Sequence, residues 1–211
     1  MTAVEVTPLG RSRQELADAA AVAARAFHFD PFFIYLCGNP LLRARGLSLF
    51  CRSILAGFGD AGALYGARQP DGRLVGVAGW LRPGRYPLPV PTQLRQAAGA
   101  LWALFPRPRA LIDGTKYLVA TDKVHPREPI WYLSLLVVDP SVQRSGIGTL
   151  LQGDGLAAAD ADGLDCYLET QNRDNLAYYA RFGYEQVEEL RPVRGGPPLY
   201  TMRRRSRPSA R

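Results

Sequence analysis

The chain has 211 residues, and 47% of them are hydrophobic, which suits one folded domain with a sizeable core. It holds no apolar run long enough to cross a membrane, and its three cysteines include no CxxC pair. We therefore expect no membrane span, no disulfide framework and no structural zinc. Five of the seven net positive charges lie in residues 203–211, which leaves +2 for the rest and favours a solvated basic tail over a nucleic-acid site.

The first 81 residues predict strands and helices with recognisable boundaries. Ser12 and Glu15 form a capping-box pattern ahead of an alanine-rich segment, which indicates a helix start. A Pro-Asp-Gly turn at residues 70–72 separates two apolar runs, which is typical of a strand pair. The expected elements are a strand over residues 3–7, helices over 14–27 and 40–58, and strands over 63–67 and 74–81.

The middle of the chain predicts an insertion before the core strand. Residues 82–91 are a proline-rich connector, and residues 92–124 predict two helices that are split at Pro106-Arg107-Pro108. We expect substrate selectivity to reside in this insertion. Trp102 and Tyr117 are candidate pocket residues, although a core role fits each of them better.

The central segment, residues 133–151, predicts a site for an anion. Leu133–Val138 is apolar except for Ser134, which indicates a strand buried on both faces, and Asp139-Pro140 ends it. Gly146 and Gly148 then precede an alanine-rich helix. The first turn of a helix has free amide groups and partial positive charge, and glycines let a phosphate approach the backbone.

The C-terminal segment completes one α/β domain over residues 1–202, followed by a tail over 203–211 that we expect to be disordered. Asp174 precedes a short helix, and Gly183 is placed to end it. The expected strands cover residues 164–170, 184–189 and 199–203.

Two motifs identify the anion. The third glycine of a dinucleotide fingerprint and the lysine of a P-loop are both missing here. Instead, Gln143-Arg144-Ser145-Gly146-Ile147-Gly148 resembles the acyl-CoA pyrophosphate loop of the GNAT N-acetyltransferase superfamily, and Asn175, Tyr179 and Gly183-Tyr184 resemble its second signature. Within that superfamily the last two-fifths of the chain are most similar to puromycin N-acetyltransferases, through residues 126–133, 168–170, 175–176 and 179–184.

The resemblance implies a fold and a cofactor. The fold would be α/β, with a mixed, mostly antiparallel central sheet, a splayed parallel strand pair and helices on both faces. Acetyl-CoA would be the co-substrate, with no metal. The residues expected to bind it are Leu136, Val137, Val138, Gln143, Arg144, Ser145, Gly146, Ile147, Gly148, Thr149 and Asn175.

The resemblance also implies direct acetyl transfer to a primary amine. Tyr179 would protonate the leaving thiolate, and the neighbouring Tyr178 would pack in the core. An amine is cationic at neutral pH, so a base is needed, and Glu169 is the first candidate. Glu169 is equally suited to a structural role, in which it would bind loop amides. Glu128, His125 and Asp30 are weaker candidates for the base.

The acceptor is less defined than the cofactor. By resemblance the aromatic segment 28–36 would line the acceptor pocket; as a hydrophobic elbow it would instead pack two helices on the sheet. Phe29, Phe32, Tyr35 and Trp131 are the predicted substrate contacts, and they favour a small, partly apolar amine such as an antibiotic-like nucleoside amine. Alternatives are a non-catalytic acyl-CoA-binding domain and an acetyltransferase of peptide or protein amines.

The expected partners are acetyl-CoA and an amine, without a membrane or nucleic acid, and the resemblance allows a homodimer. The first residues lack a basic stretch followed by an apolar one, so we expect no secretory signal and a cytoplasmic location.

Overall fold

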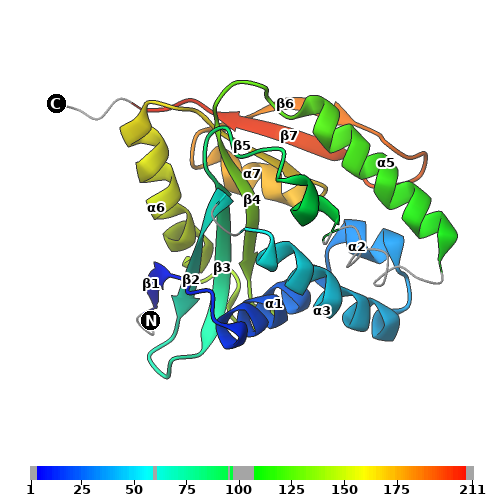
Figure 1. Cartoon of the computed structure of the whole chain (residues 1–211), viewed down its shortest axis with the longest axis horizontal. Helices are drawn as coiled ribbons and strands as arrows, with labels where there is room; N and C mark the ends of the chain where they lie inside the picture. The colour runs from blue at the N-terminus through cyan, green and yellow to red at the C-terminus, as the bar shows by residue number, and fades with distance from the viewer. Residues whose placement is uncertain (1–3, 59–60, 95, 97–106, 208–211) are drawn as a thin grey trace.

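The computed structural model describes residues 4–58, 61–94, 96 and 107–207 (Figure 1). The predicted pocket residue Trp102 lies outside the described residues. Within the described part of the chain, no helix has both the length and the apolar character needed to span a membrane.

A mixed sheet forms the centre of the molecule, and its described strands follow the order β1-β2-β3-β4-β5-β7-β6. Neighbouring strands run antiparallel except for β4 and β5, which are parallel. The strands are β1 (Glu5–Pro8), β2 (Gly62–Arg68), β3 (Leu74–Leu81), β4 (Trp131–Val138), β5 (Cys166–Thr170), β6 (Tyr184–Leu190) and β7 (Leu199–Arg204). This confirms the predicted α/β fold class.

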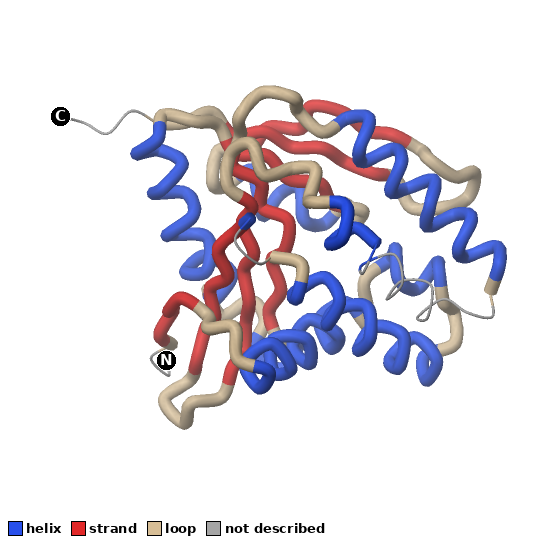
Figure 2. Tube along the Cα trace, in the orientation of Figure 1, coloured by secondary structure: helices blue, strands red, loops and turns tan. Residues whose placement is uncertain are grey.

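Helices cover both faces of the sheet (Figure 2). The helices α1 (Arg13–Phe27) and α3 (Pro40–Ala56) pack on one face, and α6 (Ile147–Asp162) and α7 (Asp174–Ala180) pack on the other. We call the first face the α1/α3 face and the second the α6/α7 face. The helix α5 (Pro108–Val124) contacts both β7 and the short helix α2 (Pro31–Leu36) (Figure 1).

Local signals set the helix boundaries. Ser12 accepts a hydrogen bond from the Glu15 amide, and the Glu15 carboxylate accepts one from the Gly10 amide, which confirms the predicted helix start. Asp30 caps α2 in the same way, and Pro31 occupies its first turn. The helix α2 was not predicted, since its aromatic segment was expected only to join the two longer helices.

A β-bulge in β4 reverses the face of the sheet to which the following side chains point. Gly79 pairs with Leu135 while Trp80 pairs with Leu133, so Ser134 is the extra residue. As a result Leu133 packs on the α6/α7 face and Leu135 packs on the α1/α3 face. Ser134 itself is exposed, and burial alternates along the strand. Both faces of β4 therefore pack against helices, as predicted, although Ser134 is exposed and other side chains of the strand are only partly buried.

The strand β7 reaches further than predicted. It ends at Arg204, one residue beyond the predicted strand, so that both Arg203 and Arg204 of the predicted tail over residues 203–211 belong to the sheet. Arg204 is buried and forms two hydrogen bonds with the Asp160 carboxylate on α6, at 2.8 and 2.7 Å. Arg203 binds Asp165 and Glu128 at 2.7 Å each. These ion pairs extend the strand because they give both arginines fixed partners.

Candidate active site

The turn between β4 and α6 has the backbone geometry of an anion site. Arg144 and Gly146 both have positive φ, at 62° and 88°. Gly146 occupies the N-cap of α6 and supplies no side-chain cap, so the amides of the first turn are not covered by a capping side chain. Side-chain bonds hold the turn: Gln143 donates to the Val138 carbonyl at 3.1 Å, and Ser145 donates to the Val142 carbonyl at 2.6 Å.

Tyr178 supports this turn from α7. Its hydroxyl accepts a hydrogen bond of 2.9 Å from Gln152, a fully buried side chain of α6. A Cβ at Gly148 would lie 2.6 Å from the same hydroxyl. Tyr178 therefore fixes the start of α6, and Gly148 is the residue that leaves room for it. The prediction gave Tyr178 only a core role, so its contact with the turn is new.

The strands β4 and β5 separate soon after they begin. They pair only through Trp131 with Cys166 and Tyr132 with Tyr167, so the later residues of each strand face an open seam. Leu136 and Val138 are partly exposed there, whereas Val137 is buried. At the end of β5, Asn175 donates to the Thr170 hydroxyl at 3.0 Å. Such a seam offers unpaired backbone groups to an extended ligand.

Tyr179 lies on the α6/α7 face. It is 8% exposed and packs with residues of β4 and β5, and its ring contacts Tyr178 and Tyr184. Burial, and then the neighbouring Tyr178, raises the pKa of its phenol. The hydroxyl therefore keeps its proton at neutral pH. Its hydroxyl has no hydrogen-bond partner among the residues that the structure describes, so it is free to donate to a ligand.

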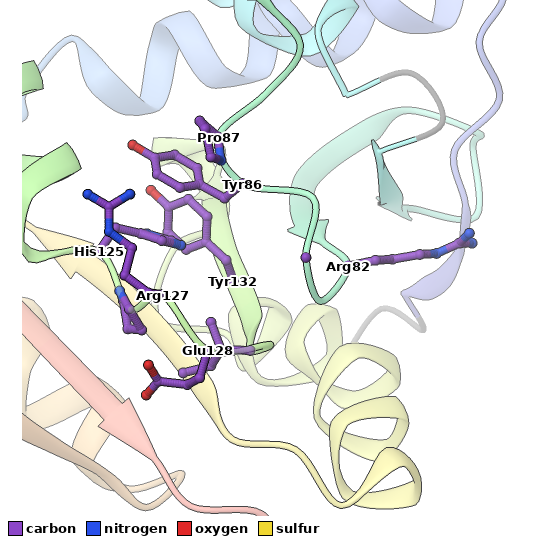
Figure 3. A pocket seen from close by; sticks show the side chains of 10 residues that line it. Arg82, Tyr86, Pro87, His125, Arg127, Glu128 and Tyr132 are labelled. Carbon is purple, nitrogen blue, oxygen red and sulfur yellow. The ribbon is translucent and has the colours of Figure 1, made fainter.

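A cavity of about 250 Å³ lies between the two ends of the β3–β4 insertion (Figure 3). Tyr86 comes from the connector after β3, His125 follows α5, and Tyr132 comes from β4. The Tyr86 and His125 rings stack with centroids 3.7 Å apart, and the Tyr132 ring meets His125 edge-on at 4.8 Å. The lining residues are Arg82, Gly84, Tyr86, Pro87, His125, Pro126, Arg127, Glu128, Ile130 and Tyr132.

Glu169 lies behind His125 in this region. Tyr167 and Glu169 alternate along β5 with Cys166 and Leu168, which pack on the α6/α7 face, so they point to the opposite face. The Nδ1 atom of His125 is 3.6 Å from a carboxylate oxygen of Glu169, and the two side chains are 4% and 5% exposed. Neither of these two atoms has a hydrogen-bond partner among the described residues.

The predicted substrate contacts do not gather at this cavity. Phe29 is 69% exposed, Phe32 packs against Tyr117 on α5, and Tyr35 donates to Asp113 at 2.9 Å. Trp131 packs on the α6/α7 face, where its indole donates to Asp162 at 2.9 Å. Asp30 caps α2.

Other predicted positions have structural partners of their own. Tyr117 is buried and donates to the Pro197 carbonyl. The predicted cofactor residues Arg144 and Thr149 are exposed at the turn, whereas Ile147 is buried beneath it.

The pairing of His125 with Glu169 and the stacking of Tyr86 on His125 were not predicted from the sequence. The sequence carries one weak signal for this site. If residues 164–170 form a strand, Tyr167 and Glu169 must lie on the same face of the sheet. No group of three or more His, Cys, Asp or Glu residues in the described part of the chain is arranged to hold a metal ion.

Comparisons with known proteins point to one family. Residues 45–184 match the model of the acetyltransferase (GNAT) family. A solved structure from Corynebacterium glutamicum, described as histone acetyltransferase HPA2 and related acetyltransferase, is 24% identical with a TM-score of 0.70, and all of both chains is covered.

Two further solved structures share the fold. Arylalkylamine N-acetyltransferase 2 from Aedes aegypti is 14% identical with a TM-score of 0.61, covering 97% of this chain and 99% of that one. The PaiA N-acetyltransferase from Thermoplasma acidophilum, solved with coenzyme A, is 14% identical with a TM-score of 0.57, covering 96% and 99%.

Proposed function

The chain belongs to the GNAT family of acetyl-CoA-dependent acetyltransferases, and we propose that it acetylates the primary amine of a small molecule by direct attack in a ternary complex. The observation that carries this proposal is the open seam between β4 and β5, which leads from the turn at Gly146 towards the buried carboxylate of Glu169. Acid and base candidates then lie on opposite faces of the sheet, with the seam between them.

The turn and the seam would hold the cofactor. Backbone amides of residues 144–149 would bind the pyrophosphate, because several amide bonds to one anion are individually strong. The pantetheine arm would run along Leu136–Val138 as an added strand. Backbone amides on the same edge would polarise the thioester carbonyl. Asn175 supports this path by tying α7 to the end of β5.

Tyr179 would serve as the general acid. The tetrahedral intermediate collapses by breaking the C–S bond, and the thiolate then takes a proton. A phenol whose pKa is raised by burial keeps its proton until the thiolate forms beside it. A non-catalytic acyl-CoA-binding domain would not need this residue, so its presence favours an enzyme.

Glu169 would help to accept the proton that the amine must lose. An alkyl amine with a pKa of about 10.4 pays roughly 4–5 kcal/mol to lose its proton at pH 7, at about 1.36 kcal/mol per pH unit. A carboxylate within reach of the bound amine, directly or through a neighbouring group, gives this proton an acceptor inside the site.

The size of the cavity favours a small acceptor. Drug-sized ligands occupy pockets of about 300–1,000 Å³, so about 250 Å³ suits the amine-bearing end of a molecule rather than a protein surface. The name of the Aedes aegypti relative supports an amine on an aromatic group, and the resemblance to puromycin N-acetyltransferases supports a nucleoside amine. The name of the Corynebacterium glutamicum relative favours the rival, a protein amine.

We also propose that residues 1–202 act as one catalytic domain in the cytoplasm. The three cysteines are all free and buried, which is typical of proteins from a reducing compartment. Light scattering of the purified protein tests the homodimer that the family resemblance allows.

A thiol-release assay with acetyl-CoA tests the function. The panel comprises puromycin, arylalkylamines, polyamines, amino acids and short peptides, each assayed with the wild type, Tyr179→Phe and Tyr178→Phe. We expect turnover of one class of small amine. We also expect kcat to fall about 100-fold in Tyr179→Phe with little change in the KM for acetyl-CoA.

The matched variant Tyr178→Phe should show the opposite pattern, a higher KM for acetyl-CoA with kcat nearly kept, because its hydroxyl supports the turn. Acetyl-CoA binding without turnover of any amine would favour the binding-domain alternative. Turnover of peptides alone would replace the small-molecule acceptor with a protein amine.

A further inference from the structure

We propose that the cavity lined by Tyr86, His125 and Tyr132 receives the acceptor amine, and that His125, backed by Glu169, takes its proton. This rests on the acetyl transfer proposed above and deepens it by naming the acceptor pocket, the proton acceptor and the class of amine. It also changes the expected roles of two residues: Glu169 becomes the partner of the base, and His125 becomes the base.

The first reason is a pair of buried polar atoms without partners. Leaving a buried donor or acceptor unpaired costs about 1–3 kcal/mol. Here His125 Nδ1 and one oxygen of Glu169 are both buried and unbonded, 3.6 Å apart. A proton held between these two atoms would satisfy both, and it would leave Nε2 of His125 to accept a proton from an amine in the adjoining cavity. The separation is longer than a hydrogen bond, as is common for catalytic groups before substrate binds.

The second reason is that the tyrosine hydroxyls around the cavity cannot accept the proton of the amine. Burial, and then the charges of Asp122 and Glu169, raises the pKa of Tyr86 to about 12. Burial and the Glu169 charge also raise the pKa values of Tyr132 and Tyr167. All three hydroxyls therefore keep their protons at neutral pH and cannot act as the base that takes the proton of the amine.

The remaining carboxylate on the cavity wall is already engaged. Glu128 is bound by Arg203 at 2.7 Å, and hydrogen bonds to its carboxylate, including the one from Arg203, lower its pKa. Its side chain is half exposed, and Figure 3 shows it directed away from Tyr86 and His125. Among the side chains described around the cavity, His125 and Glu169 are therefore best placed to accept a proton.

The third reason is that His125 lies between the cavity and Glu169. His125 lines the cavity, whereas Glu169 lies behind it and is not part of the lining. Imidazole is a neutral base near physiological pH, and a carboxylate behind it stabilises the imidazolium that forms. The stacked Tyr86 ring and the Tyr132 and Tyr167 edges, at 4.8 and 5.1 Å, hold the imidazole and exclude water.

The protons balance as follows. His125 takes one proton from R–NH3⁺, and the free nitrogen attacks the thioester carbonyl carbon. The C–S bond then breaks, and the sulfur takes a proton from Tyr179. Two protons leave the nitrogen in all: one reaches solvent through the cavity, and the other replaces the proton given to sulfur. The products are the amide, CoA thiol and one released proton.

The walls of the cavity define the class of amine. Aromatic rings on two sides suit an amine carried on a flat or apolar group. Arg127 lies at the rim beside His125, whereas the Arg82 side chain points away (Figure 3). A second cationic group on the acceptor would meet the Arg127 guanidinium, so we expect monoamines to be preferred over polyamines.

The test compares two amines that differ in basicity. One is an alkyl amine that is protonated at pH 7, and the other is a weakly basic amine of similar shape that is already neutral. We expect His125→Gln to lower kcat/KM about 100-fold for the first and less than about 5-fold for the second. The acid limb of its pH profile should move to higher pH, because the alkyl amine must then lose its proton to water.

Glu128→Gln removes the other carboxylate of the cavity wall and tests the rival base. If its acid limb moves to higher pH as that of His125→Gln is expected to do, Glu128 and not His125 takes the proton, and the inference is overturned. An equal loss on both amines in His125→Gln would mean a structural role for His125 and would overturn the inference. If the wild type turns over no amine, the proposed function itself fails; if it does and His125→Gln matches it, only this inference fails.

A second measurement needs no variant of the site. The chain has two histidines, so histidine ring NMR gives two sets of signals, and His28→Gln assigns them. Adding the reactive alkyl amine together with CoA, which carries no acetyl group, should move the His125 signals and leave those of His28 in place. Unmoved His125 signals at a saturating amine concentration would place the acceptor elsewhere.

Discussion

At the scale of single residues, Gly148 shows how closely the turn before α6 is packed. A Cβ at this position would lie 2.6 Å from the Tyr178 hydroxyl, so Gly148→Ala must displace the side chain that braces the turn. We expect Gly148→Ala to lower the affinity for acetyl-CoA about 10-fold, as measured by calorimetry. The helix gains about 1 kcal/mol of propensity from the alanine, and the displacement of Tyr178 outweighs this gain.

Two variants make this prediction specific. Gly153 lies in the same helix with open space around it, so Gly153→Ala should raise the melting temperature and leave acetyl-CoA binding unchanged. In the double variant Gly148→Ala, Tyr178→Phe, the hydroxyl is gone and the added Cβ fits. Affinity should then return towards that of Tyr178→Phe alone; no such recovery would rule out this contact as the cause.

The role of a residue could be predicted when the residues it acts with lie next to it in the sequence. The turn at residues 143–148 could be predicted because its signal lies in consecutive residues. In the structure, Arg144 and Gly146 of this turn have positive φ angles. The His125–Glu169 pair joins residues from two distant segments, and Tyr86 comes from a third. No pattern in one sequence reports such a contact, because only the sheet brings these segments together.

At the scale of elements, one buried ion pair ties β7 to α6. The Arg204 side chain is 4% exposed and is bound to Asp160 through two hydrogen bonds. Arg204→Met would leave the Asp160 carboxylate without its partner, and we expect a loss of about 3 kcal/mol in the free energy of unfolding in urea. Arg203→Met is the control: its ion pairs are more exposed, so its loss should stay below about 1 kcal/mol.

Most elements could be predicted, and the failures have physical reasons. Capping residues, prolines and glycines mark the helix ends, and apolar runs mark the strands. The helix α2 was missed because six residues are too few for a periodic pattern, although Asp30 and Pro31 carry the start signal. The bulge in β4 was not predicted, because the extra residue Ser134, which turns the following side chains to the other face, lies within a continuous apolar run.

At the scale of the whole molecule, several carboxylates link stability to pH. Hydrogen bonds from Arg204 lower the pKa of Asp160 despite its burial. Burial raises the pKa values of Asp139 and Asp165, but their hydrogen bonds and neighbouring arginines outweigh it, so both are lowered overall. A group with a lowered pKa stabilises the fold above its unfolded value, about 3.9 for Asp, and this stability is lost as pH falls through the folded value.

We therefore expect the free energy of unfolding to be nearly constant between pH 5 and 7 with respect to these groups and to fall below about pH 4. Urea titrations at pH 7, 5, 4 and 3 measure this. The variant Asp160→Asn should start lower and lose less between pH 5 and 3. A wild-type stability that is unchanged at pH 3 would contradict the role given to these ion pairs.

The overall architecture was the most predictable level. Two motifs in the C-terminal half resemble those of the GNAT family, and the fold of that family implied the mixed sheet, its splayed pair and the helices on both faces. The boundary of the tail was less predictable. Five arginines in nine residues suggest a solvated segment, yet Arg203 and Arg204 are held by carboxylates from distant parts of the chain.

The open seam also divides the sheet mechanically. Only two residue pairs join β4 to β5, so β1–β4 and β5–β7 are each hydrogen-bonded within themselves and barely to each other. Side-chain packing on the α6/α7 face joins the two parts of the sheet, since one core cluster there contains residues from β4 and from β5–β7. Under force or partial denaturation, β1–β4 should separate from β5–β7 along this seam. A cofactor bound in the seam would contact both parts and hold them together. Amide exchange along Leu133–Val138 would then report how firmly the two halves are joined.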